Sequence, residues 1–313
     1  MNQDNLVKIE ECFRSARITG EISDSSILKY RDSIKKFLSI VDKTFESLTI
    51  IDFEDFILKM RDNGAGNSRI ANVISAVKWL INNLQIRDMI KKTLDLEKVK
   101  KPKVGKKEVN YLTEEEIEQF LDCIRKDIEK RETVKNIRIM AFVMLLLQTG
   151  ARIGEVLSIN IEDINRQNKE VPIIGKGNKP RTLFLKDETL NCIDKYLSIR
   201  CGNEKALFAT QNGESRWEQT DVGRSFRRYK KMSGIKKEFT IHTLRHTFAS
   251  QYLMKGAGIS VVQAALGHSD PVTTLKYYSG VVEKVKVREM INDSHFDFIS
   301  ESALKVKEPV RLQ

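Results

Sequence analysis

Cysteine is scarce in this sequence, and its four cysteines are widely separated. None of them is spaced as a metal site or a disulfide framework requires. We therefore interpret them as reduced packing residues of a cytosolic protein. They are Cys12, Cys123, Cys192 and Cys201.

Long hydrophobic runs are also missing. The longest, Met140 to Leu147, is far too short to cross a bilayer, so we expect no membrane partner. The first residues lack the basic start, apolar core and cleavage site of a signal peptide, which favours a cytoplasmic location. A chain of 313 residues is long enough for two domains with separate cores. A formal charge of +11 and a pI of about 9.3 suggest a polyanionic partner, although many proteins carry solvated basic faces.

The first 97 residues predict a helical domain. Apolar residues recur at helical spacing over 24–41 and 67–84, and Thr49 can cap a helix that runs through Met60. The Asn63-Gly-Ala-Gly66 segment breaks the chain between the last two of these helices. Together the helices predict a small bundle with a core of its own.

A basic segment over 98–110 follows, with six lysines in its first ten residues. The pattern offers no face to bury, so we expect an exposed linker. It can be a solvated hinge, or a strap whose lysines displace counterions along a DNA backbone, and we favour the strap. The candidate DNA-binding lysines are Lys98, Lys100, Lys101, Lys103, Lys106 and Lys107.

The second domain is expected over 111–294, with a tail over 295–313. Thr113 and Glu116 form a capping box, and a strongly apolar helix over 136–148 predicts the centre of the core. Short β-type runs then occur at 159–164, 171–174 and 181–185. The fold class is therefore mainly α with a small antiparallel β-sheet (α+β).

Two basic residues in this domain lie at turns. Gly150 fits the end of the apolar helix, which places Arg152 where a new helix begins, with Glu155 as a structural partner that orients it. Lys176 lies in Gly175-Lys-Gly-Asn-Lys-Pro180, a predicted hairpin tip, with Lys179 as the alternative. Alone, each side chain is commonly a solvated or ion-paired surface group.

The segment from His242 to Tyr278 holds the densest set of reactive side chains. His242 and Arg245 are three residues apart and so share one face of a helix. A short apolar helix over 259–266 leads to His268, and Asp270-Pro271 predicts the start of the helix that carries Tyr277. A phenol is a poor nucleophile at neutral pH unless nearby cations stabilise its anion or a base takes its proton.

Two residues of this segment allow alternative interpretations. Tyr277 and Tyr278 point about 100° apart on a helix, so only one can face a bound phosphate, and the other packs. His246 is either a core histidine or a supporting hydrogen-bond partner, and we favour support.

A basic helix with an apolar stripe is predicted over 219–232. It can have a solvated face, or it can lie in or beside a DNA groove. Its candidate DNA-binding residues are Arg224, Arg227 and Arg228.

The order His-x-x-Arg-His, Leu-Gly-His and Thr-Thr-x-x-Tyr, with Tyr277 nine residues after His268, resembles the tyrosine recombinase (phage integrase) family, in its compact Xer-like form. The family also has an upstream arginine and a hairpin lysine, which match Arg152 and Lys176. The resemblance covers about 107–278, and its spacing favours Tyr277 over Tyr278. It implies six catalytic residues: Arg152, Lys176, His242, Arg245, His268 and Tyr277.

The resemblance implies a site-specific recombinase that cleaves and rejoins duplex DNA through a 3′-phosphotyrosyl intermediate, without metal, ATP or other cofactor. The N-terminal bundle would be the core-binding domain. The active form would be a homotetramer on two sites, with the C-terminal segment docked onto a neighbour. A second recombinase or an accessory protein can also take part.

Three other functions use related features. A type IB topoisomerase has a similar residue set, but the motif order and the compact architecture argue against it. A DNA-binding protein that has lost its chemistry would keep the fold, yet here every catalytic position is filled. A zinc hydrolase can use His242 and His246, but position 243 is Thr where that motif has Glu.

Overall fold

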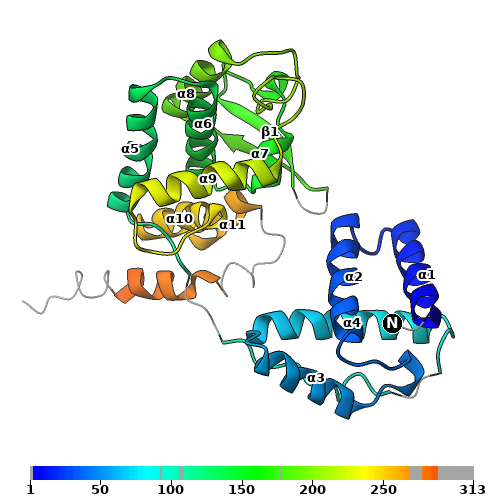
Figure 1. Cartoon of the computed structure of the whole chain (residues 1–313). Helices are drawn as coiled ribbons and strands as arrows, with labels where there is room; N and C mark the ends of the chain where they lie inside the picture. The colour runs from blue at the N-terminus through cyan, green and yellow to red at the C-terminus, as the bar shows by residue number, and fades with distance from the viewer. Residues whose placement is uncertain (1–2, 92–93, 106–108, 176–177, 268–276, 288–313) are drawn as a thin grey trace, which may run out of the picture. The chain divides into compact units, whose positions relative to one another are not determined.

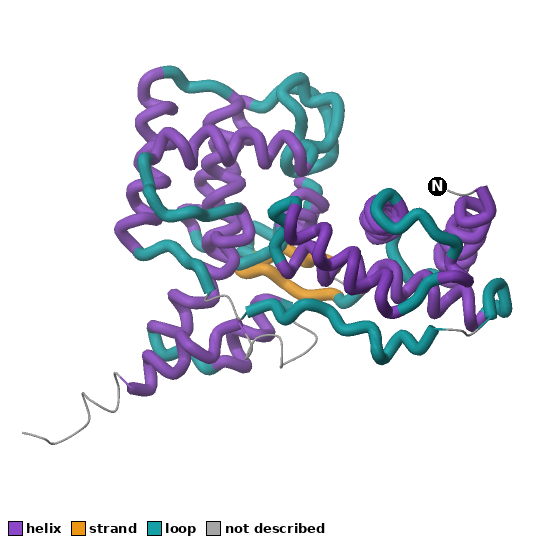
Figure 2. Tube along the Cα trace, turned by 60° about the horizontal axis from the view of Figure 1, so that its bottom comes forward, coloured by secondary structure: helices purple, strands orange, loops and turns teal. Residues whose placement is uncertain are grey.

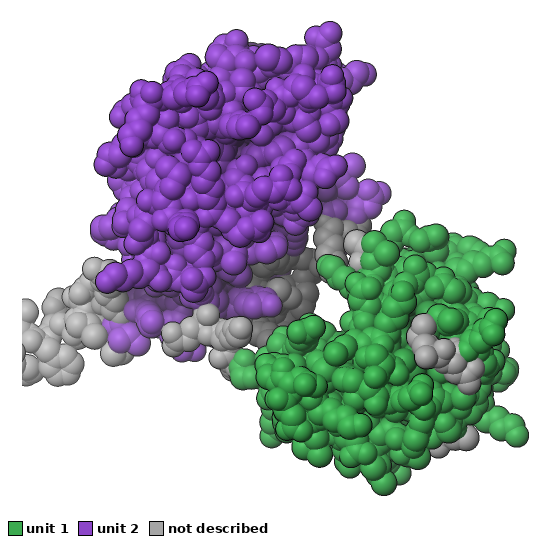
Figure 3. Space-filling model, in the orientation of Figure 1, with its two compact units in different colours: residues 1–107 green, residues 108–313 purple. Residues whose placement is uncertain are grey.

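The computed structural model describes residues 3–91, 94–105, 109–175, 178–267 and 277–287. The chain divides into two compact units, residues 1–107 and 108–313, which Figure 3 colours separately. Each unit has its own hydrophobic core. The predicted fold class, mainly helical with a small antiparallel sheet, is confirmed.

Unit 1 is a helical bundle built around one long central helix, α4 (Figure 1). Apolar residues of α4, among them Ile70, Ile74 and Val77, are fully buried against the other three helices. A short 3₁₀ turn, η1, precedes α3. The helices are α1 (Gln3–Thr19), α2 (Asp24–Leu38), α3 (Ile50–Asp62) and α4 (Asn67–Ile86), and η1 is Phe45–Ser47.

The basic segment after this bundle is not the fully exposed linker that we predicted. Val99 is buried in the core of unit 1, and its carbonyl accepts a hydrogen bond of 3.2 Å from Lys78 on α4. Asn67 donates to the carbonyl of Lys103 at 2.9 Å. The described lysines are exposed as predicted, and the prediction missed the burial of Val99. A single valine among lysines gives no periodic pattern, yet one apolar side chain can anchor an irregular segment to a neighbouring helix.

Unit 2 is organised around α6, whose apolar residues are buried on nearly every side. α5, α8 and α10 pack around it, and α9 lies across α5 (Figure 1). The helices are α5 (Glu114–Lys130), α6 (Val134–Thr149), α7 (Ile153–Ser158), α8 (Asp187–Ile199), α9 (Gln219–Ser233), α10 (Ile241–Met254) and α11 (Ile259–Leu266). Residues 277–287 are also helical.

The sheet of unit 2 is one antiparallel hairpin, drawn in orange in Figure 2. Strand β1 (Glu170–Ile174) pairs with β2 (Pro180–Phe184), and Ile173 lies opposite Arg181. The prediction of a first strand at 159–164 is wrong, because Ile161–Asp163 forms a 3₁₀ turn, η2. The Asp163 carboxylate accepts a hydrogen bond from the backbone of Asn160, which favours a turn over an extended strand.

None of the helices in the described ranges combines the length and apolar composition needed to cross a membrane.

Candidate active site

Arg152 lies at the turn between α6 and α7, as the sequence predicts. Gly150 ends α6 with a positive φ of 60°, and a Cβ there would lie 2.5 Å from a ring atom of Phe248. The tight turn places Arg152 as the N-cap of α7. Its backbone N–H and its Nη1 both donate to the carboxylate of Glu155, each at 2.7 Å. Glu155 therefore orients Arg152, in agreement with the sequence interpretation.

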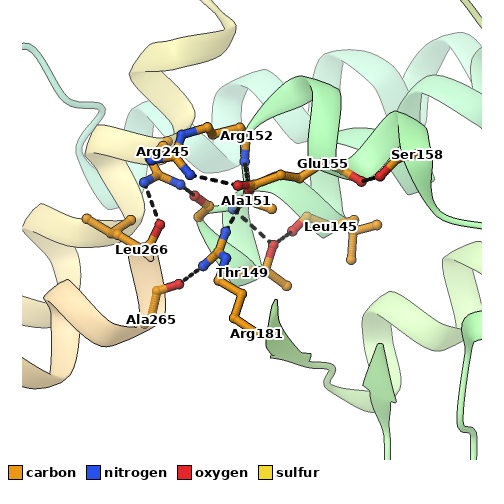
Figure 4. Close-up of polar contacts among 11 residues, drawn as sticks. Leu145, Thr149, Ala151, Arg152, Glu155, Ser158, Arg181, Arg245, Ala265 and Leu266 are labelled. Carbon is orange, nitrogen blue, oxygen red and sulfur yellow. Dashed lines mark hydrogen bonds and ion pairs between the residues drawn. The ribbon is translucent and has the colours of Figure 1, made fainter. Parts of the chain in front are cut away.

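Arg245 comes from α10 and is held in place by main-chain carbonyls (Figure 4). Its Nη1 donates to the carbonyl of Gly150 and its Nη2 to that of Leu266, each at 2.6 Å. The side chain is buried, with the residue only 8% exposed. These two bonds fix the guanidinium between the last turns of α6 and α11 and use two of its five N–H donors.

A third arginine, Arg181, joins this cluster, and our sequence analysis missed it. Its Nη2 donates to Glu155 Oε2 at 2.7 Å, and its Nη1 donates to the carbonyl of Ala265 (Figure 4). The signal for it was present in the strand alternation. Residues 181, 183 and 185 share one face of a strand, and Leu183 and Leu185 are buried. A charged arginine on a buried face needs a hydrogen-bonding or oppositely charged partner, so its position predicts one.

The cluster of Arg152, Arg181, Arg245 and Glu155 is strongly cationic. Three guanidinium groups and one carboxylate leave a formal charge of +3 − 1 = +2. Burial, together with Arg152 and Arg181, lowers the pKa of Arg245 to about 10, so it stays charged at neutral pH. Burial alone would raise the pKa of Glu155, but the amide of Arg152 and the two guanidiniums lower it overall, so Glu155 is a carboxylate. An anion would offset the remaining charge.

Two aromatic side chains, His246 and Tyr278, lie near Arg245 of this cluster. His242 is exposed at the start of α10, and His246 lies one turn further on. His246 Nδ1 and the hydroxyl of Tyr278 are hydrogen-bonded at 2.7 Å, which matches the supporting role predicted for His246. Burial, then His242 and Arg245, lower the pKa of His246, so its ring is neutral at pH 7. Tyr278 is therefore a packed, hydrogen-bonded residue.

Tyr277 differs from Tyr278 in its exposure to solvent. It is 50% exposed, whereas Tyr278 is 1% exposed. Its ring centroid lies 5.9 Å from that of His246. Within the described part of the chain, no hydrogen bond joins Tyr277 to the arginine cluster. Two other predicted catalytic residues, Lys176 and His268, lie outside the described residues, as do the segment from Asp270 to Pro271 and the C-terminal tail.

The predicted DNA-binding residues belong to both units. Lys98, Lys100, Lys101 and Lys103 are exposed along α4 of unit 1, while Lys106 and Lys107 lie outside the described residues. On α9 of unit 2, Arg224 pairs with Asp221 at 3.0 Å and Arg228 with Asp127 at 3.4 Å. Arg227 is exposed and has no ion pair among the residues that the structure describes. Of the three arginines, it is the one most available to a phosphate.

No group of three or more histidine, cysteine, aspartate or glutamate side chains is arranged to hold a metal ion in the described parts of the chain.

The "Phage integrase family" model matches residues 110–283, more than half of the chain. The chain therefore belongs to the phage integrase family of tyrosine site-specific recombinases. It is 30% identical over 297 residues to the tyrosine recombinase XerD of Staphylococcus haemolyticus, covering 92% of this chain and 98% of that one. It is 29% identical to XerD of Oceanobacillus iheyensis, covering 92% and 97%.

Solved structures share the same fold. A XerH site-specific recombinase in a post-cleavage complex with palindromic difH substrate has a TM-score of 0.71 at 21% identity, covering 90% of this chain and 84% of that chain. The Tn1549 transposon integrase with circular intermediate DNA has a TM-score of 0.69 at 21% identity, covering 90% and 98%. At these identities the likeness shows the fold alone.

Proposed function

We propose that this protein cuts and rejoins duplex DNA at specific paired sites through a covalent link between Tyr277 and a 3′-phosphate. The observation that carries the proposal is the cluster of three arginines around Glu155, whose excess charge of +2 suits a phosphodiester. Tyr277, a half-exposed phenol whose ring centroid lies 5.9 Å from that of His246, would supply the nucleophile. Relatives named XerD match nearly the whole chain, which supports an Xer-type role over mobile-element integration.

In the proposed reaction, Arg152 and Arg245 bind the non-bridging oxygens of the phosphate. Negative charge grows on these oxygens as the phenol attacks, so fixed cations lower the barrier. Arg245 keeps three N–H donors after its two bonds to carbonyls. Because those carbonyls belong to two helix ends, the guanidinium is positioned before DNA arrives and needs little reorganisation.

The proton transfers complete the proposed step. His242 accepts the phenol proton, the bond from the Tyr277 oxygen to phosphorus forms, and the bond from phosphorus to the 5′-oxygen breaks. Lys176 gives a proton to the departing 5′-oxygen, and His268 donates a hydrogen bond to the phosphate. The 5′-hydroxyl of another strand then reverses the step. The phosphodiester energy is kept in the tyrosyl ester, so the reaction requires neither ATP nor a metal.

The choice of Tyr277 over Tyr278 rests on burial and hydrogen bonding. The hydroxyl of Tyr278 is engaged with His246, and burial raises the pKa of Tyr278. Ionising Tyr278 would therefore cost more than ionising an exposed phenol. Tyr278 instead anchors the helix that presents Tyr277.

The remaining parts of the chain receive roles that fit this reaction. We assign residues 1–97 as a core-binding domain, 98–110 as a basic strap, 111–294 as the catalytic domain and 295–313 as a tail. The strap and α9 would contact the phosphate backbone. Anchoring of Val99 supports the strap, because it holds the neighbouring lysines beside α4. Acting on chromosomal DNA, the protein would be found at the nucleoid in the cytoplasm.

We further propose a homotetramer on two DNA sites, in which the C-terminal segment of one copy docks onto the next. Unit 2 has an apolar groove of about 540 Å³ between β2, α10 and α11. Phe184 and Val261 line it and are more than 60% exposed, at 67% and 63%. An apolar segment from a neighbour would cover them. A chain truncated after residue 287 should bind one site but not assemble paired sites. A second recombinase or accessory protein can complete the assembly.

The proposed chemistry is tested with a nicked DNA substrate in which cleavage releases a short fragment carrying the 5′-hydroxyl. Once this fragment is lost the step cannot reverse, so the covalent complex is trapped. In EDTA, the wild-type protein and the Tyr278→Phe variant should form the complex, and Tyr277→Phe should not. Loss of the complex in Tyr278→Phe alone would overturn the choice of nucleophile. If the wild-type protein binds DNA tightly but forms no covalent complex with any substrate, the result would instead indicate a DNA-binding protein of the same fold.

A further inference from the structure

Arg181 connects three parts of the site through its side chain. It lies on β2, five residues after Lys176, and its guanidinium donates to Glu155 and to the carbonyl of Ala265. Glu155 in turn holds both the backbone and the side chain of Arg152. One residue therefore links the hairpin strand, the turn before α7 and the last turn of α11.

The stem of Arg181 is also fitted closely to its surroundings. Gly267 ends α11 with a positive φ of 63°, and a Cβ there would lie 2.8 Å from Arg181 Cδ and 3.0 Å from its Nε. The Nε atom is buried and has no hydrogen-bond partner in the described residues. The Arg181 side chain therefore packs directly against Gly267, the residue before His268, and a larger side chain at position 267 would clash with it.

The charge balance explains what Arg181 contributes. If Arg152 were the only cation paired with Glu155, the buried carboxylate would neutralise it and weaken its attraction for a phosphate. With Arg181 on Glu155 Oε2, that carboxylate is shared by two guanidiniums. The excess charge is then +2, whereas it would be +3 − 1 − 1 = +1 without Arg181. Sharing leaves Arg152 oriented by Glu155 and still available to the substrate.

We propose that Arg181 is a positioning residue for the cleavage step, which acts on Arg152 through Glu155. This inference rests on the proposed function, since it assigns Arg181 a part in the same phosphoryl transfer. Arg181 makes no contact with the attacking phenol in this role. Its effect is to keep Arg152 in place and cationic when the transition state forms.

Single-turnover cleavage of the nicked substrate at saturating protein tests the proposal. Arg181→Gln should lower the cleavage rate constant about 100-fold, with the DNA Kd changed less than about 3-fold. Arg181→Lys keeps the charge but cannot reach both acceptors with a planar fork, and should recover about 10-fold of the loss. Arg166→Gln is the matched control, because Arg166 pairs with Asp194 on the surface of the same unit.

A double-mutant cycle separates positioning from general support of the fold. In a Glu155→Gln background, Arg181→Gln should lower the rate by less than about 3-fold, since the intermediary is already lost. Equal 100-fold losses in both backgrounds would overturn the route through Glu155. Unchanged cleavage by Arg181→Gln would overturn the inference altogether.

Two further outcomes keep the test decisive. If Arg181→Gln does not fold, Arg181→Lys carries the comparison, and a folded lysine variant with wild-type cleavage counts against the proposal. If the wild-type protein itself forms no covalent complex, the proposed function fails first. That result is distinct from a cleaving wild type whose rate does not depend on Arg181.

Discussion

The buried arginines and the exposed arginines of unit 2 show two ways of presenting positive charge. Arg245 is held by two main-chain carbonyls and Arg181 by a carbonyl and a buried carboxylate. On α9, Arg224 and Arg228 make ion pairs with exposed or half-buried aspartates. Such surface pairs contribute about 0–1 kcal/mol and exchange readily with other anions. The buried arginines are suited to stabilising a transition state at one position. The surface arginines are suited to binding a DNA backbone that can shift along the protein.

The largest effect should come from changing the fixed arrangement. Arg245→Lys removes the planar fork that reaches both Gly150 and Leu266, so we expect cleavage to fall about 10²–10³-fold. Arg227→Lys, which keeps the charge on an exposed position, should change the rate less than about 2-fold. Single-turnover cleavage measures both. Similar losses in the two variants would show that the two regions do not differ as described.

The turn that supports Arg245 should be the next most sensitive feature. Gly150→Ala puts a Cβ 2.5 Å from Phe248 Cδ1 at a positive φ, so overpacking adds to backbone strain. We expect a loss of about 2–5 kcal/mol in the free energy of unfolding.

Gly234 ends α9 with a similar φ of 69°, but a Cβ there would meet nothing within 4 Å. Gly234→Ala should therefore cost only the backbone term, about 1–2 kcal/mol. Urea denaturation of both variants measures the difference. Equal losses would mean that packing around Gly150 adds nothing to the conformational cost.

A smaller effect is expected at the hydrogen bond between His246 and Tyr278. Tyr278→Phe leaves the half-buried His246 ring without this partner and should cost about 1–3 kcal/mol in unfolding free energy. Tyr252→Phe, which alters a tyrosine that is 42% exposed, is the control and should change stability by less than about 0.5 kcal/mol. A Tyr278→Phe protein as stable as the control variant would contradict the anchoring role.

The same pair predicts a pH dependence. Burial lowers the pKa of folded His246 below its unfolded value of about 6.5, so the unfolded chain binds the extra proton first. The unfolding free energy should therefore fall as pH drops below about 6.5 towards the folded pKa. His246→Gln should show a weaker decline over this range in denaturation at pH 7.5 and 5.5. An unchanged decline would assign the effect to other groups.

The smallest effect should appear on α9. Arg227 is a cation with no ion pair in the described chain. Arg227→Gln should remove one phosphate contact, so the plot of log DNA association constant against log salt concentration should become less steep by about 0.9. Arg228→Gln should change it less, because Asp127 already holds that side chain. DNA binding titrations at several salt concentrations measure the slopes. A larger change for Arg228 would reverse this ranking.

Helix prediction succeeded where caps and periodicity agreed. The Thr113 capping box begins α5, Gly150 and Gly267 end α6 and α11, and the apolar stripe of residues 136–148 lies within α6. The strand predicted at 159–164 failed because alternating isoleucines fit a capped turn equally well. The basic segment was misjudged at Val99, since one buried side chain leaves no pattern.

The sequence by itself determined the fold class, the helices and the order of motif residues that marks the family, because caps and spacing act over a few neighbouring residues. It also favoured Glu155 as the partner of Arg152, three residues away on one helical turn. Only the tertiary structure decided that Arg181 shares Glu155, that Arg245 is held by Gly150 and Leu266, and that Tyr278 is bonded to His246. Those contacts join residues 21 to 95 positions apart, and local patterns carry no information about which distant segments meet.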